Sequence, residues 1–117
     1  MEQQSYWVQT TDQQRLYVKT WGNANNPVLV LVHGYPDNQE VWEPVIGHLV
    51  QDYYIVTYDV RGAGMSSVPR RTRAYALPQL SLDLESVVNS VIPQRSFHLV
   101  AHDWGSIQSW ESATEPK

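Results

Sequence analysis

The sequence predicts an α/β fold with a mostly parallel sheet, helices on both faces and an antiparallel amino-terminal hairpin. Short apolar runs alternate with segments of helical apolar spacing, as in strand–helix–strand units. The apolar runs are continuous, which is typical of strands covered on both faces. Two segments rich in aromatic and β-branched residues precede them, close enough together to form a hairpin.

The predicted strands can be taken in chain order. Residues 5–10 and 16–21 are expected to pair around a turn at residues 11–14. Residues 28–32 and 54–58 read as buried strands. The run that begins at Phe97 has the same character and predicts a further buried parallel strand.

Apolar residues at helical spacing predict one helix between each pair of these buried strands. The first carries the stripe Trp42, Val45, Ile46, Leu49 and Val50. Asp37 or Asn38 could cap it, and Pro44 must lie in its first turn. The second begins at Pro78, ends at Pro93 and carries the stripe Leu80, Leu84, Val87, Val88 and Val91. A third helix is expected to start after Asp103.

Composition narrows the classes of function. The 117 residues include no cysteine, which excludes disulfides and thiolate chemistry, and they carry a formal charge of −4, which argues against nucleic-acid partners. No apolar run is long enough to span a membrane, so we expect a cytoplasmic protein. No motif indicates a cofactor or a metal. The basic residues 70–73 read as a solvated loop.

Chemistry-bearing residues follow three of the predicted strands. His33, Gly34, Tyr35 and Pro36 follow the first buried strand, and residues 59–66 form a glycine-bearing loop after the second. Asp103 follows the third. Because the carboxyl ends of parallel strands meet at one edge of a sheet, a ligand site is expected there. We expect Asp59 and Arg61 to fix their loop rather than bind substrate.

The turn around Asp103 has the spacing of a nucleophile turn. Ala101 and Gly105 stand two residues to either side, and such a strand–turn–helix needs small flanking residues because backbone passes close by. A serine usually occupies the centre, whereas this chain has an aspartate. The alternative interpretation is that Asp103 only caps the next helix.

These motifs together resemble the α/β-hydrolase fold, and within it the epoxide hydrolases. The matching segments are His33-Gly34-Tyr35-Pro36, Arg61-Gly62-Ala63-Gly64-Met65-Ser66 and His102-Asp103-Trp104-Gly105. The resemblance implies that Asp103 is the nucleophile and that the backbone N–H groups of Tyr35 and Trp104 form an oxyanion hole. It implies supporting roles for His33, Gly34, Pro36, His102 and Gly105, a small apolar epoxide as substrate, and no cofactor. The segment from Ala101 onward is also similar to hydrolase domains fused to a short-chain dehydrogenase domain.

An aspartate at this position favours attack on saturated carbon. A carboxylate that displaces a leaving group there forms a stable alkyl ester, which water can then hydrolyse at its carbonyl. Epoxides and alkyl halides are both such substrates. Resembling haloalkane dehalogenases have asparagine where this chain has Tyr35, and fluoroacetate dehalogenases have arginine where it has Trp104. Epoxide hydrolysis is therefore the favoured reaction, and haloalkane dehalogenation is the alternative.

The resemblance also implies machinery that residues 1–117 do not contain. The histidine base, its acid partner and the lid tyrosines of the resembling proteins all lie downstream of the nucleophile helix. We therefore expect residues 1–117 to be the amino-terminal part of one hydrolase domain, truncated after that helix and inactive alone. The further alternative is a non-catalytic fragment or binding module.

Overall fold

Five strands and three helical segments make up the part of the chain that the computed structural model describes, residues 3–33, 38–69 and 75–101. The strands are β1 (Gln3–Gln9), β2 (Arg15–Trp21), β3 (Val28–Val32), β4 (Tyr54–Tyr58) and β5 (Phe97–Ala101). The helical segments are the 3₁₀ helix η1 (Gln39–Trp42), α1 (Glu43–Leu49) and α2 (Leu77–Val91). The third helix predicted after Asp103 lies outside these residues.

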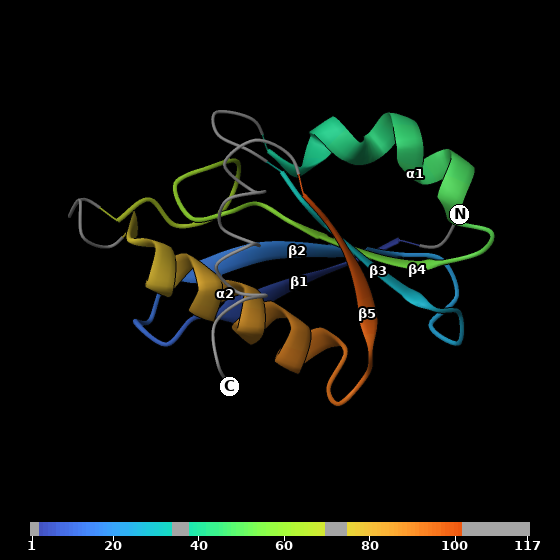
Figure 1. Ribbon diagram of the computed structural model, residues 1–117. Coiled ribbons are helices and arrows are strands. Elements are labelled where there is room, and N and C mark those ends of the chain that lie inside the picture. The colour runs from blue at the N-terminus through green and yellow to red at the C-terminus, as the bar shows by residue number, and fades with distance from the viewer. Residues whose placement is uncertain (1–2, 34–37, 70–74, 102–117) are drawn as a thin grey trace.

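One sheet contains all five strands in the order β1-β2-β4-β3-β5. β3 pairs in parallel with both β4 and β5, whereas β2 pairs antiparallel with β1 and with β4. Helix α1 lies on one face and α2 on the other (Figure 1). The structure therefore confirms the α/β class, the antiparallel amino-terminal hairpin and the helices on both faces.

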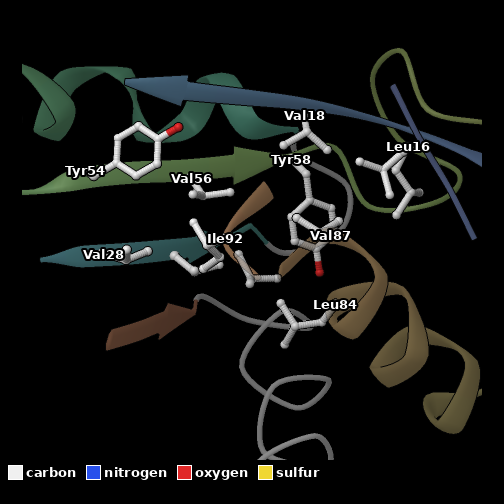
Figure 2. Close-up of a cluster of buried hydrophobic side chains, with 12 residues drawn as sticks. Leu16, Val18, Val28, Tyr54, Val56, Tyr58, Leu84, Val87 and Ile92 are labelled. Atoms are coloured by element: carbon white, nitrogen blue, oxygen red, sulfur yellow. The ribbon is translucent and has the colours of Figure 1, made fainter. Parts of the chain in front are cut away.

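Each face of the sheet has its own apolar core. Figure 2 shows the cluster beneath α2, where Leu84, Val87 and Ile92 face the strands. Ile46 of α1 packs on the opposite face against Trp21, Leu29, Leu31 and Ile55. Burying a side chain of this kind contributes roughly 1.5–3 kcal/mol. β3 and β4 are buried along their whole lengths because helices cover both faces of the sheet there and each strand has a neighbour on either side. This burial explains why their sequences are continuous apolar runs.

The run from Phe97 forms a parallel strand, β5, as predicted, but the prediction that this strand is buried is wrong. Phe97 and Val100 are 36% and 42% exposed. Within the described residues β5 is the last strand of the sheet and pairs with β3 alone. An edge strand with one neighbour keeps more of its surface in water, whatever its composition.

Two details of the helices also differ from expectation. Val45 belongs to the predicted stripe of α1 but is 42% exposed, since seven residues make only two turns and Ile46 takes the inward position. Pro44 lies in the first turn as expected, and Asn38 caps η1 by accepting a hydrogen bond from the Glu40 N–H. On α2 the buried face includes Ser81 and Asp83 as well as Leu84 and Val87.

Candidate active-site edge of the sheet

The carboxyl ends of β3, β4 and β5 form one edge of the sheet. Val32, at the end of β3, is the register partner of Tyr58 on one side and of Ala101 on the other. The order of strands reverses at β3, because β4 lies beside it in one direction and β5 in the other. In open α/β sheets the ligand crevice lies outside the carboxyl ends of strands at such a reversal.

Most of the predicted site residues lie outside the described residues. These are Gly34, Tyr35, Pro36, His102, Asp103, Trp104 and Gly105. The structure does describe His33 and the two strand ends from which these segments leave the sheet. It also describes the loop that follows β4, residues 59–66.

The side chain of His33 makes a buried hydrogen bond. Its side chain is fully buried, and its Nε2 accepts a hydrogen bond of 2.9 Å from the backbone N–H of Val60. Because the Nε2 lone pair is used in this bond, that nitrogen is not available to act as a base. The contact agrees with the structural role expected for His33, and it links the end of β3 to the segment that follows β4.

Asp59 organises the loop after β4. Its Oδ1 accepts from the backbone N–H of Gln39 at 2.8 Å, and its Oδ2 accepts from the N–H of Met65 at 3.0 Å. Gly64 lies directly against this carboxylate. The Ser66 hydroxyl donates to the Asp59 carbonyl and accepts from the Tyr17 N–H. The loop is therefore fixed by hydrogen bonds to the carboxylate and carbonyl of its own Asp59 and by a hydrogen bond from Tyr17 of β2.

Gln39 is buried and uses both ends of its side-chain amide. Its Nε2 donates to the Tyr17 carbonyl at 3.1 Å, and its Oε1 accepts from the Thr57 hydroxyl at 2.6 Å. The Thr57 hydroxyl in turn accepts from Trp21 Nε1. Since buried amides are costly unless they are hydrogen-bonded, these contacts fix the first residue of η1 firmly against β2 and β4.

Arg61 joins three segments through two carboxylates. Its Nε and Nη2 contact Asp83 of α2 at 2.6 and 2.7 Å, and both Nη atoms contact Asp12 of the hairpin turn at 2.8 Å. The hydrogen bonds from Arg61 lower the pKa of Asp12 from 3.8 to about 2. Burial raises the pKa of Asp83. Burial alone would lower the pKa of Arg61, but its two carboxylate partners raise it. As expected from the sequence, these contacts hold the loop.

Sequence reasoning missed Gln39, Asp12 and Asp83. One of them, Asp83, carried a usable signal. Asp83 interrupts the inner face of an amphipathic helix next to Leu84, and a lone acid there indicates a buried partner such as Arg61. Gln39 carried none, because its acceptor and donor come from β2 and β4, which only the folded sheet brings together.

Among the described residues, no helix is both long enough and apolar enough to cross a membrane. The same part of the chain holds no group of three or more His, Asp or Glu side chains arranged to bind a metal ion.

The fold and the edge described above define an open α/β sheet whose strand order reverses at β3. Residues 27–115 match the family model described as alpha/beta hydrolase fold. The chain belongs to this family.

Within this family, the chain is similar to two curated proteins and to one crystal structure, as follows. "Probable oxidoreductase EphD" of Mycobacterium tuberculosis is 39% identical over 115 residues, which are 98% of this chain and 19% of that protein. "Epoxide hydrolase 3" of Xenopus tropicalis is 32% identical over 99 residues, or 85% of this chain and 27% of that protein. The crystal structure of Epoxide Hydrolase A from Mycobacterium thermoresistibile superimposes with a TM-score of 0.85 at 31% identity, covering 96% of this chain and 35% of that one. The chain thus spans about a fifth to a third of the length of these relatives.

Proposed function

We propose that the protein carrying this chain hydrolyses small apolar epoxides to vicinal diols, with Asp103 as the nucleophile. One observation carries the proposal. Val32 and Ala101 are register partners on adjacent parallel strands, so the segments with Tyr35 and Asp103 leave the sheet at neighbouring positions of one edge. Because the two segments start from adjacent strand ends, this arrangement favours an interaction between the backbone N–H of Tyr35 and the carboxylate of Asp103.

In the first step an Asp103 carboxylate oxygen attacks one carbon of the epoxide ring. A C–O bond forms to the enzyme, the ring C–O bond breaks, and its electron pair goes to the epoxide oxygen. That oxygen takes a proton from a donor beyond residues 1–117. The product is a hydroxyalkyl ester of Asp103, which is stable because the reaction takes place at saturated carbon.

In the second step water attacks the carbonyl carbon of this ester. A histidine base takes the water proton, and negative charge develops on the carbonyl oxygen. The backbone N–H groups of Tyr35 and Trp104 would stabilise that charge, and losing one such donor typically costs about 10²–10³ in rate. The acyl C–O bond then breaks, the histidine gives the proton it took from water to the leaving alkoxide oxygen, and the diol is released, with Asp103 regenerated carrying one oxygen from water.

The choice of epoxides over alkyl halides follows from Tyr35 and from the named relatives. Resembling dehalogenases have asparagine at the position of Tyr35, where its side chain helps to hold the halide. The hydrolases named above are epoxide hydrolases. Haloalkane dehalogenation remains the second candidate because its chemistry uses the same aspartyl ester. A non-catalytic binding module is the third.

We further propose that residues 1–117 act as the amino-terminal part of a longer hydrolase. The relatives are three to five times longer than the matched segment, and the base, its acid partner and the epoxide proton donor are expected downstream. The match to "Probable oxidoreductase EphD" supports a fused dehydrogenase domain as one form of that longer protein.

Product analysis with the natural protein that carries this chain tests these assignments. We expect styrene oxide to give phenylethanediol, 1-chlorobutane to release no chloride, and Asp103→Asn to abolish diol formation. Chloride release without diol formation would establish the dehalogenase instead. Residues 1–117 expressed alone should give no diol, and turnover by this piece that Asp103→Asn abolishes would refute the proposed division of the machinery.

A further inference from the structure

We propose that the outer edge of β1 binds the same edge of a second copy of this protein, by antiparallel β1–β1 pairing about a twofold axis. β1 lies at the opposite end of the sheet from β5 (Figure 1), and among the described residues it pairs with β2 alone. The inference is independent of the proposed function, because it uses no residue of the candidate active site.

The register shows which backbone groups point outward from β1. Tyr17 uses both of its backbone groups on the side of β2 away from β1, since its N–H donates to Ser66 and its carbonyl accepts from Asp59, directly after β4. Its register partner Trp7 therefore directs its own N–H and C=O groups away from β2. Because these directions alternate along a strand, the residues with outward groups are Gln3, Ser5, Trp7 and Gln9.

This edge has none of the features that ordinarily protect a strand edge. Natural sheets block their edges with lysine, proline, bulges or very short strands. β1 has seven residues, carries no charge and no proline, and keeps its register with β2 without a bulge. The nearest cations on the Trp7 face are Arg15 and Lys19 of β2, which lie over the Trp7 and Tyr17 rings. The edge is therefore open to another strand, which main-chain hydrogen bonds would hold.

The sequence of β1 is suited to pairing with itself. A twofold axis through Tyr6, normal to the sheet, overlaps all seven residues and keeps each face of the sheet continuous. Gln3 then pairs with Gln9 of the second copy, so that their amides can hydrogen-bond. Ser5 pairs with Trp7, a small residue beside a large one. Since β1 is uncharged, pairing two identical strands places no like charges opposite each other. This self-complementarity identifies the occupant as a second copy.

Trp7 adds an apolar contribution to the association. Its side chain is 47% exposed, although its ring lies 5.0 Å from that of Tyr17. In the symmetric pairing the two Trp7 side chains are diagonal neighbours on one face, at a separation that aromatic side chains can span. Each copy thus covers apolar surface that the other leaves in water.

Sedimentation velocity of the natural protein that carries this chain, over the micromolar range, tests the inference with two double variants. Gln3→Glu with Gln9→Glu places like charges opposite each other in both outer pairs of the interface. Gln3→Lys with Gln9→Glu places opposite charges there. Both positions are exposed, so neither variant should lose stability. We expect a reversible wild-type dimer, and a dimer of the second variant that is about tenfold or more tighter than that of the first.

A cysteine pair tests the position of the axis. Tyr6→Cys places the two sulfurs opposite each other, in a pair of residues whose Cα atoms lie about 4.5 Å apart, within the range for a disulfide. Mild oxidation should therefore link the two copies. Gln4→Cys is the matched control on the same face, because its two copies are four residues apart along the strands, or about 13 Å. Wild-type protein under the same oxidation is the reference.

Several results would overturn the inference. A wild-type protein that stays monomeric over this range would do so. A dimer that both double variants retain equally would use another surface, and equal cross-linking of Gln4→Cys and Tyr6→Cys would exclude the proposed axis. A monomer in which the Ser5 and Trp7 amides are protected from hydrogen exchange would show that another segment or protein occupies the edge.

Discussion

Gly64 occupies a position where any side chain would collide with Asp59. A Cβ built there would lie 2.3–2.7 Å from the three atoms of the Asp59 carboxyl group, and the residue has φ +51°. We predict that Gly64→Ala destabilises the protein by at least about 1–3 kcal/mol, because it adds backbone strain and displaces the carboxylate. The free energy of unfolding in urea measures this.

Gly47 provides the matched control on α1. An added Cβ there meets nothing within 4 Å, and alanine is favoured over glycine inside a helix by about 0.5–1 kcal/mol. Gly47→Ala should therefore stabilise slightly. Similar effects of the two substitutions would mean that the close contact between Gly64 and Asp59 does not exist.

For individual residues, the sequence predicted a role only where the residue lay in or next to a recognisable motif. His33, Asp59 and Arg61 were expected to serve the structure around the site, and the contacts of all three agree with this expectation. Gln39 could not be found, because a glutamine in a predicted loop is ordinarily solvated. Its burial depends on a carbonyl of β2 and a hydroxyl of β4.

At the scale of elements, the central strands followed from composition alone. β3 and β4 have the bounds that their apolar runs predict, since continuous apolar residues suit strands covered on both faces. Exposure of β5 could not be predicted from its own residues, because it depends on how many neighbours the strand has. The 3₁₀ helix η1 was also missed, as its polar residues have no helical apolar spacing.

The Arg61 cluster is what holds hairpin turn, loop and helix together. Arg61→Ala would leave the buried carboxylate of Asp83 without its cation, and we predict a loss of about 3–5 kcal/mol. Thermal unfolding at neutral pH measures the loss.

A double variant separates charge from packing in this cluster. Arg61→Met with Asp83→Leu removes both buried charges and keeps apolar bulk, so it should recover much of the lost stability. Recovery by the double variant, together with a large loss in Arg61→Ala, identifies an uncompensated buried charge as the cause. A loss below about 1 kcal/mol in Arg61→Ala would contradict the buried ion pair of Arg61 with Asp83.

At the scale of the whole molecule, the outer side of β5, which has no partner strand among the described residues, has a consequence for residues 1–117 expressed alone. Unpaired strand edges promote association between chains, and Phe97 and Val100 add exposed apolar surface. We predict that this piece aggregates and that Val100→Lys reduces the aggregation. Light scattering after size exclusion measures both, and a monodisperse species with a cooperative melt would contradict the prediction.

In the proposed mechanism Asp103 becomes esterified, and water then attacks the carbonyl of the ester. A single turnover of styrene oxide in H₂¹⁸O by the natural protein tests it most directly, with the Asp103 peptide and the diol analysed by mass spectrometry. We expect one ¹⁸O in the Asp103 carboxylate and none in the diol of that first turnover. Label in the diol with none in Asp103 would show direct attack by water on the epoxide and would contradict the account.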